Sequence, residues 1–212
     1  MTPFDPRVRL PGFITWLYRS AIWRMPTREK VVYLTFDDGP VPEITPWVLD
    51  LLEQENIRAT FFCVGENVMK YPEVYQQVLG NGHSVGNHTY NHWQGLKHQN
   101  EDYFRNIVKA DSYIRSNLFR PPHGWLKLSQ YRYLKKEFTI VMWDLISCDY
   151  NRQLSPEQVF RNVSDFARPG SVITFHDSVK AWPNLKEALP RAIKWLKEQG
   201  YQFDVIPFKQ DD

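Results

Sequence analysis

Short apolar runs alternate with longer segments of helical periodicity along this chain. The runs are rich in β-branched and aromatic residues and are bounded by Gly, Pro, Asn or Asp, a pattern typical of buried strands. We expect strands at Val31–Thr35, Ala59–Val64, His83–Gly86, Leu118–Arg120, Phe138–Trp143, Ser171–Phe175 and Phe203–Ile206. Between them, apolar residues spaced three and four apart predict helices over 42–55, 67–79, 101–117, 127–137, 156–167 and 185–199.

This alternation of strands and helices predicts an α/β fold, because parallel strands have to be joined by crossover connections. Polar side chains follow nearly every predicted strand, at Asp37, His88, Arg120, Asp149 and His176. In a barrel the carboxyl ends of all strands converge on one mouth. We therefore predict a deformed (β/α) TIM-like barrel of seven or eight parallel strands, in preference to a doubly wound sheet.

The 212 residues, of which 42% are hydrophobic, are enough for one large domain with a full core. We assign residues 31–208 to the barrel and residues 1–30 to an N-terminal extension that packs on it. In the extension, the segment Phe13–Trp23 is rich in aromatic residues and is flanked by Arg9 and Arg24. We favour a helix that covers the barrel, and contact with a membrane surface is the alternative.

Composition narrows the set of partners. The net charge is only +2 and the basic residues are scattered, which argues against a nucleic-acid partner. No apolar run reaches the about 18 residues of a transmembrane helix, and the N-terminus lacks the features of a signal peptide. The sequence on its own therefore predicts a cytoplasmic protein, and it leaves the oligomeric state undefined.

Two adjacent carboxylates, Asp37 and Asp38, follow the first predicted strand. Neighbouring acids repel each other, so both stay ionised only beside a cation or an arginine, and capping of the next helix is the alternative. His88 and His92 lie four residues apart, close enough for both rings to reach one ion. Together with Asp38 they form a ligand set for Zn²⁺ or another divalent transition metal, whereas a pair of exposed or capping histidines would explain the spacing alone.

Three further segments carry candidate catalytic groups. Arg120 begins RPPHG, in which two prolines make a rigid loop, and the N–H of His123 is the first one available to face a developing negative charge. Arg120 itself is a candidate partner for a carboxylate. His176 is a candidate general acid if a carboxylate such as Asp149 keeps it protonated. The structural alternatives are a plain ion pair for Arg120 and a hydrogen-bonded core histidine for His176.

The segments TFDDGP, HTYNH, RPPHG, WDLISCDY and ITFHD resemble, in order and approximate spacing, the five motifs of polysaccharide deacetylases, the NodB-homology domain of carbohydrate esterase family 4. The resemblance spans about residues 31–206. It implies a deformed (β/α) barrel and metal-dependent removal of acetyl groups, typically from N-acetylglucosamine-type sugars in peptidoglycan, chitin or related polymers. Such domains are often extracytoplasmic, which is at odds with the cytoplasmic prediction.

The same resemblance implies a role for each matching residue. Asp37 would be the catalytic base and His176 the general acid. The metal ligands would be Asp38, His88 and His92. Arg120 would orient the base, Asp149 would bias His176 towards its protonated form, and the backbone N–H of His123 would help to bind the oxyanion.

The chain departs from the family pattern at four positions. His123 stands where an aromatic residue such as Tyr is frequent, and Ile146 and Tyr150 stand where Asp and Trp are usual. Thr174 replaces a common Leu that lines the pocket for the acetyl methyl group, which puts acyl preference in question. Four aromatic residues follow the motif segments, which are Trp93, Trp125, Tyr150 and Trp182. We expect one or two of them to stack on sugars, Trp125 first because it flanks the rigid loop, and the others to pack in the core.

These observations lead to the hypothesis of a hydrolase that removes N-acetyl groups from an N-acetylglucosamine-type glycan, peptidoglycan or chitin-like. Zn²⁺ is the expected metal, and Co²⁺ or Ni²⁺ are alternatives. A deacylase of a small acetyl ester or amide, or a catalytically silent carbohydrate-binding barrel, are the competing hypotheses. A non-haem iron oxygenase would also use two histidines and a carboxylate, but its usual β-sandwich setting contradicts the alternation of strands and helices.

Overall fold

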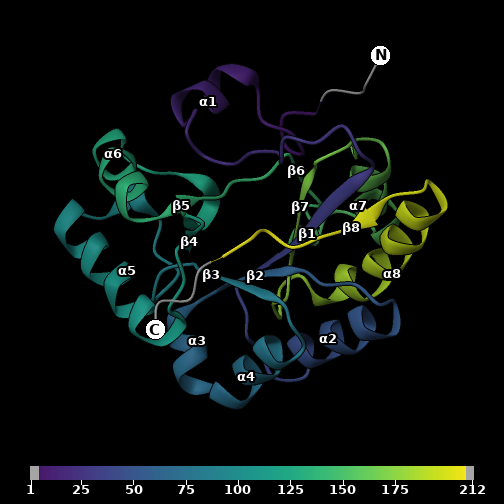
Figure 1. The fold of residues 1–212 in the computed structure, drawn as a ribbon, viewed down its shortest axis with the longest axis horizontal. Helices are drawn as coiled ribbons and strands as arrows, with labels where there is room; N and C mark the ends of the chain where they lie inside the picture. Colours follow the sequence, from purple (N-terminus) through teal and green to yellow (C-terminus); the bar gives the residue numbers. More distant parts are fainter. Residues whose placement is uncertain (1–4, 209–212) are drawn as a thin grey trace.

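The computed structural model describes residues 5–208, which form one curled sheet of parallel strands (Figure 1). Seven strands pair in the order β5-β4-β3-β2-β1-β7-β6, and β8 pairs with the start of β1. This curled half-barrel in a single domain confirms the deformed barrel predicted from the sequence. The strands are β1 (Val31–Asp37), β2 (Thr60–Cys63), β3 (Ser84–Asn87), β4 (Leu118–Phe119), β5 (Thr139–Ile140), β6 (Leu145–Ile146), β7 (Val172–His176) and β8 (Gln202–Phe203).

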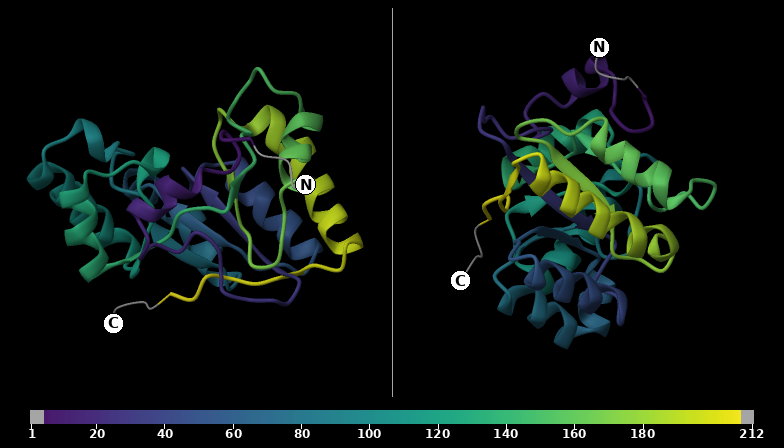
Figure 2. Two further views of the ribbon diagram at one scale, coloured as in Figure 1. Left: turned by 90° about the horizontal axis from the view of Figure 1, so that it is seen from above. Right: turned by 90° about the vertical axis from the view of Figure 1, so that its right-hand side faces the viewer.

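Helices lie around the outside of the curled sheet (Figures 1 and 2). They are α1 (Gly12–Leu17), α2 (Ile44–Gln54), α3 (Gly65–Lys70), α4 (Pro72–Gly80), α5 (Asn100–Ile114), α6 (Leu128–Glu137), α7 (Pro156–Ser164) and α8 (Trp182–Glu198), with short 3₁₀ turns at Gly95–Lys97 and Pro122–Gly124. The helix expected over 67–79 is divided in two, because Pro72 occupies the first position of a new helix, where its missing N–H costs nothing. Within the described residues, no helix combines the length and the apolar character needed to span a membrane.

The central strand is β1, which pairs with β2 on one side and with β7 on the other. Its residues from Val32 onward are buried, and the Phe36 ring stacks on Phe61 at 5.0 Å between centroids. The strand continues two residues beyond the predicted end at Thr35. Asp37 is therefore still in the strand and pairs in register with His176 of β7, so these two strands bring a carboxylate and an imidazole to one edge of the sheet.

The single strand predicted at Phe138–Trp143 is wrong, because the chain changes its hydrogen-bonding partner in the middle of this run. The N–H of Val141 donates to the carbonyl of Phe119 in β4, and the N–H of Met142 donates to that of Ile22. The N–H of Asp144, just after the run, donates to Val172 of β7. The start of the run is therefore β5, and β6 follows the run at the opposite edge of the sheet. Trp143 lies in the connection between them.

Part of the N-terminal segment lies across the opening between β5 and β7. Ile22 forms a parallel bridge with Val141, and Arg24 forms an antiparallel bridge with Ser171. Tyr18 is buried, and its hydroxyl donates to the carbonyl of Leu126 at 2.7 Å. In contrast, α1 buries none of its own residues.

Candidate active site

Asp37 and Asp38 face different partners although they are neighbours in the chain. Asp37 is buried at the end of β1, and its Oδ1 accepts a hydrogen bond from Nη1 of Arg120 at 2.6 Å. Asp38 has a left-handed conformation with φ of 83°, which turns its carboxylate towards the two histidines. Its Oδ1 lies 3.1 Å from Nε2 of His92 and 3.8 Å from Nε2 of His88. The turn at Asp38 thus separates an arginine-bound carboxylate from a histidine-facing one.

His88 follows β3 directly, and its ring is fixed by a neighbouring strand end. Its Nδ1 donates a hydrogen bond to the carbonyl of Arg120 at 2.7 Å, so Nε2 is the nitrogen that carries the free lone pair. Burial lowers the pKa of His88 to about 4, which keeps this ring neutral near pH 7. One ligand atom each from Asp38, His88 and His92 lies within 4.8 Å of the others.

The surroundings of the Asp38 carboxylate indicate whether these three residues can bind a cation. Its Oδ1 is buried, and within residues 5–208 it accepts no hydrogen bond. Nε2 of His92 is close enough for an ion pair, but the contact does not have the angles of a hydrogen bond. Burial raises the pKa of Asp38, but the contact with His92 and the charges of the nearby histidines lower it by more, so the group is ionised. A buried anionic oxygen without a donor is costly unless a cation satisfies it. Two imidazole nitrogens and one carboxylate oxygen therefore fit a divalent metal, with positions left for water or substrate.

Arg120 is fully buried and connects the strand ends. Besides Asp37, its donors reach Oγ1 of Thr35 on the same strand at 2.8 Å, Oγ1 of Thr174 on β7 at 3.2 Å and the carbonyl of Met142 at 2.8 Å. Burial lowers the pKa of Arg120, and the charge of Asp37 partly compensates. A guanidinium stays protonated in any such setting, so Arg120 places a positive charge beside Asp37 and fixes the direction of its carboxylate.

On the other side of the cluster, His176 is held by Asp149. Oδ1 of Asp149 accepts from Nδ1 of His176 at 2.7 Å, and Oδ2 accepts from the backbone N–H of His176 at 2.8 Å. Burial on its own lowers the pKa of His176, but the charge and the hydrogen bond of Asp149 outweigh it and raise the pKa to about 9. His176 is therefore an imidazolium near pH 7, and its Nε2–H is the donor not used by Asp149.

A cavity of about 430 Å³ brings these groups together. The residues with a predicted role that line it are Asp37, Asp38, His88, His92, His123, Tyr150 and His176. The Tyr150 ring lies edge-on to the His176 ring at 5.0 Å between centroids, and the His123 ring lies 4.9 Å from the His92 ring. The cavity thus combines the candidate metal ligands with a buried carboxylate and an imidazolium.

Two of the predicted substrate contacts lie elsewhere. Trp125 is 38% exposed and is not among the residues that line the cavity. Thr174 is fully buried, and its hydroxyl contacts Nη1 of Arg120 and Oγ1 of Thr35. Ile146, at the other position where the chain departs from the family pattern, does line the cavity. We therefore revise the position expected for Thr174, from the acyl pocket to the support of Arg120.

The other aromatic residues considered for sugar stacking face protein. Trp93 stacks on His98 at 3.9 Å, and Trp182 packs edge-on against Trp47 at 5.0 Å. Both rings are partly buried against hydrophobic clusters of the interior. Their positions therefore agree with a packing role.

Sequence reasoning missed several residues of this region. Arg7, Trp143 and Lys180 also line the cavity. Trp143 is the first residue of WDLISCDY and Lys180 lies three residues after ITFHD, a signal that could have drawn attention to them. Arg7 belongs to the extension, and no spacing or motif connects it with the strand ends.

Asp177 was also missed, although it is the last residue of ITFHD. It is fully buried, its Oδ1 accepts from the N–H of Gly39 at 3.1 Å, and its Oδ2 accepts from the Thr45 hydroxyl at 2.6 Å. Burial raises the pKa of Asp177 to about 8. Its contacts tie the end of β7 to the turn that carries Asp38.

The fold and the site define a class of protein, an α/β half-barrel with a candidate metal centre between a carboxylate and an imidazolium at the strand ends. Comparison with known proteins identifies the family. The family model described as polysaccharide deacetylase matches residues 24–139. The chain belongs to this polysaccharide deacetylase family.

Individual relatives extend the match beyond residue 139. A peptidoglycan-N-acetylglucosamine deacetylase of Bacillus cereus is 36% identical over 191 residues, which cover 86% of this chain and 69% of the relative. The peptidoglycan-N-acetylmuramic acid deacetylase PdaA of Bacillus subtilis is 31% identical, with 85% and 71% covered. A crystal structure of a peptidoglycan N-acetylglucosamine deacetylase in complex with an N-oxidanyl-benzamide compound superimposes with a TM-score of 0.85 at 32% identity, covering 93% of this chain and 95% of that one.

Proposed function

We propose that this protein is a metal-dependent hydrolase that removes N-acetyl groups from N-acetylglucosamine-type glycans, with peptidoglycan as the first substrate to test and chitin-like polymers as the second. The observation that carries the proposal is the arrangement around one cavity. An Asp/His/His cluster lies between a carboxylate bound to arginine and an imidazolium bound to aspartate. Binding of a sugar alone would need neither of these two flanking groups.

Asp37 is the proposed base. Its Oδ1 is engaged by Arg120, so the carboxylate has a fixed direction and its Oδ2 is the oxygen available to accept the proton of the attacking water. The buried guanidinium of Arg120 places a positive charge beside Asp37 within the barrel interior. The pair thereby supplies an oriented carboxylate that lines the cavity.

His176 is the proposed acid. An amine leaves an amide only after protonation, because an amide anion is a very poor leaving group near neutral pH. The Nε2–H of His176 is the donor for this step, since Asp149 occupies Nδ1. Asp149 therefore positions the ring and keeps it charged until the carbon–nitrogen bond breaks.

Asp38, His88 and His92 are the proposed metal ligands. Zn²⁺ is the metal that we propose, because two imidazoles and one carboxylate with open positions are typical of catalytic zinc, and Co²⁺ or Ni²⁺ would suit the same ligands. Such an ion, when bound, supplies Lewis acidity towards the acetyl carbonyl and the attacking water. The backbone N–H of His123, on the rigid loop after β4, would donate to the developing oxyanion.

Substrate contacts are assigned from position. Tyr150 lines the cavity beside His176 and is the aromatic residue that we propose for contact with the reacting sugar. Trp125 lies outside the cavity and remains a candidate for a neighbouring sugar of the polymer, because its ring is partly exposed. Ile146 takes the place of Thr174 as the residue proposed to face the acetyl group.

Acetate release tests the proposal directly. Protein stripped of metal and then reloaded with Zn²⁺, Co²⁺ or Ni²⁺ is incubated with N-acetylglucosamine oligomers and with peptidoglycan, and mass spectrometry of the digested glycan reports which sugar has lost its acetyl group. We expect release only from reloaded protein. His176→Ala should lower the rate by about 10²-fold or more, because it removes the acid.

The control variant is His98→Ala, since His98 stacks on Trp93 and does not line the cavity. It should keep the parental rate. Release from small acetyl esters or amides with none from any glycan would support the small-molecule deacylase. Sugar binding without release from any substrate by metal-loaded protein would support the silent barrel.

A further inference from the structure

The outward face of α1 is the most exposed apolar surface in the described chain. Phe13 and Trp16 are 71% and 69% exposed, the highest values for large apolar side chains within residues 5–208, and Leu17 is 42% exposed. These three residues are spaced three and four apart, so they lie on one face of the helix. The other exposed large apolar side chains occur at most two to an element, as on α5 and α6. A cluster of this kind marks an interaction surface.

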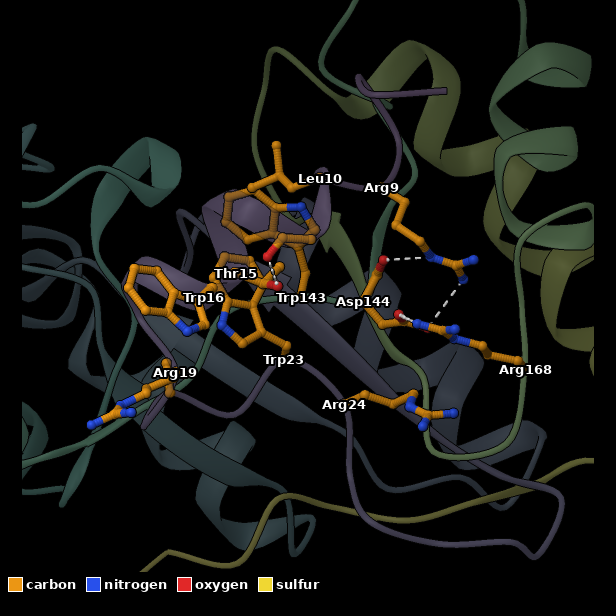
Figure 3. Close-up of a pocket in the computed structure, with 12 residues that line it drawn as sticks. Arg9, Leu10, Thr15, Trp16, Arg19, Trp23, Arg24, Trp143, Asp144 and Arg168 are labelled. Carbon is orange, nitrogen blue, oxygen red and sulfur yellow. Dashed lines mark hydrogen bonds and ion pairs between the residues drawn. The ribbon is translucent and has the colours of Figure 1, made fainter. Parts of the chain in front are cut away.

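Positive charge surrounds this face. Trp16 lies at the rim of a cavity of about 680 Å³, next to the barrel opening, whose other lining residues include Arg9, Arg19, Trp23, Arg24 and Arg168 (Figure 3). The acid among the lining residues is Asp144, and its carboxylate is already bound by Arg9 at 3.1 Å and by Arg168 at 2.9 Å. Four arginines and one carboxylate therefore line this cavity, and two of the arginines bind the carboxylate.

Two of these arginines have no acidic partner. Within the described residues, no hydrogen bond or ion pair engages the Arg19 side chain. The Arg24 side chain donates only to the carbonyl of Pro169, at 3.4 Å. Both side chains are exposed. We call Phe13, Trp16, Leu17, Arg19 and Arg24 the N-terminal patch.

We propose that the N-terminal patch docks on the surface of an anionic lipid membrane. Phe, Trp and Leu side chains on one face of a helix enter the boundary between headgroups and acyl chains, while neighbouring arginines pair with lipid phosphates. The patch has this composition, and Figure 1 shows α1 at the periphery of the molecule, on the side opposite α2 and α4. Binding to a membrane is measured at equilibrium and needs no turnover, so this proposal does not depend on the proposed enzymatic activity.

The charge of the patch and its size argue against the other occupants. A stable interface between two copies buries about 800 Å² on each partner, more than three side chains provide, and a symmetric contact would bring the arginines of both copies to one interface. An acidic glycan would satisfy the arginines but would leave Phe13 and Leu17, which lie outside the cavity, in water. A lipid surface satisfies both kinds of side chain.

Sedimentation with vesicles tests the docking. Vesicles of phosphatidylcholine with phosphatidylglycerol should bind the full chain, binding should weaken as salt is added, and phosphatidylcholine alone should bind it poorly. Trp16→Ser should weaken binding about tenfold or more, because it removes a large apolar side chain from the lipid boundary. Arg19→Gln and Arg24→Gln should each weaken binding about fivefold.

Matched control variants come from the far side of the molecule. Val108→Ser removes an equally exposed apolar side chain from α5, and Arg58→Gln removes an exposed charge ahead of β2. Neither should change vesicle binding. Trp16→Phe should keep most of the affinity but lose fluorescence quenching by brominated lipid, which places residue 16 in the boundary.

Three outcomes would overturn the proposal. The first is equal binding of parent and Trp16→Ser to anionic vesicles. The second is loss of binding to insoluble peptidoglycan, but not to vesicles, in Arg19→Gln and Arg24→Gln, which would assign the patch to an acidic glycan. The third is a dimer in sedimentation velocity that Phe13→Ser dissociates, which would assign it to a second copy of the chain.

Discussion

The charge of His176 depends mainly on the carboxylate of Asp149. Asp149 is fully buried, and one of its oxygens accepts from the imidazole while the other accepts from the backbone N–H of the same residue. Burial alone would lower the pKa of His176, and the charge and hydrogen bond of Asp149 raise it most, with smaller contributions from the charges of Asp38 and Asp37. The acid function that we propose therefore extends over two residues.

Asp149→Asn should move the pH profile of acetate release. In the parent, the acid form of His176 is present below its pKa of about 9 and is lost as the pH rises through that value, so the rate should fall on the alkaline side near pH 9. Without the charge of Asp149, the alkaline fall should shift towards or below pH 6.5, and the rate at pH 7 should drop about 10²-fold. The exposed change Asp165→Asn is the matched control. An unchanged alkaline limb in Asp149→Asn would contradict His176 as the acid.

The interaction between His176 and Asp149 should also make the stability of the protein depend on pH. The pKa of His176 is raised from 6.5 in the unfolded chain to about 9 in the fold, so the interaction stabilises the protein fully below pH 6.5 and is lost as the pH rises through 9. The free energy of unfolding, measured by denaturant titration, should therefore decrease between pH 6.5 and 9 in the parent. Asp149→Asn should reduce this decrease without abolishing it, because the raised pKa of Asp177, about 8, adds a fall of the same sign up to pH 8. A profile identical to that of the parent would show that the pair does not titrate as described.

Variants of Thr174 and Ile146 can distinguish a residue that supports Arg120 from a residue that contacts the acyl group. Thr174→Val keeps the shape of the side chain but removes the hydroxyl that faces Arg120, and should lower the free energy of unfolding by about 1 kcal/mol with little change in KM. Ile146→Ala enlarges the cavity and should raise the rate with propionyl substrates relative to acetyl substrates. The reverse result, a change of acyl preference in Thr174→Val, would restore Thr174 to the acyl pocket.

At the scale of elements, the turn between β1 and α2 determines where Asp38 lies. Its conformation is stabilised by Asp177, which binds the N–H of Gly39 and the hydroxyl of Thr45. A methyl group on Gly39 would lie 1.9 Å from Oδ2 of Asp177, so any side chain there has to displace this brace. The sequence marks Gly39 as a turn residue, but the contact that requires glycine comes from the end of β7.

Gly39→Ala should therefore lower both stability and affinity for metal. We expect a loss of about 1–3 kcal/mol in the free energy of unfolding, as for other overpacked interior sites, and weaker Zn²⁺ binding in calorimetry, because Asp38 moves with the turn. Gly80→Ala is the control, since a methyl group there meets no atom within 4 Å at the end of α4. Equal behaviour of the two variants would contradict the bracing role of Asp177.

Elements whose packing depends on their own periodicity could be predicted, and those that depend on a distant partner could not. α5 and α6 begin and end within three residues of the prediction, because their apolar faces repeat regularly along the helix. The run Phe138–Trp143 has the composition of one strand, yet within it the hydrogen-bonding partner changes from β4 at Val141 to Ile22 at Met142. The amino-acid composition of the run does not indicate that change of partner.

For the whole molecule, the sequence places the site at the strand ends because the register of parallel strands collects them at one edge. The pairing of Asp37 with His176 across β1 and β7 is an example. The sequence could not place Arg7 in the cavity, because a residue of the extension reaches it only through the folded path of the chain. The exposed face of α1 could not be distinguished from a packed one for the same reason, since both have the same pattern of apolar residues.

Removal of metal should lower the stability of the whole fold. With a divalent ion bound at Asp38, His88 and His92, the folded state gains RT ln(1 + [L]/Kd), about 4 kcal/mol at a thousandfold excess of ion over Kd, and this gain is lost on chelation. We expect Zn²⁺ to raise the Tm of stripped protein in calorimetry. The effect should weaken with acid, because protons compete for the imidazoles.

The ligand to change in this experiment is His92, because it is partly exposed, whereas His88 is fully enclosed and also holds the carbonyl of Arg120. His92→Gln should fold normally and lose most of the rise in Tm. His123→Gln is the control, since His123 lines the same cavity but stands outside the cluster of three. If His92→Gln kept the full rise while His123→Gln lost it, the ion would bind elsewhere in the cavity, and the buried oxygen of Asp38 would need another explanation.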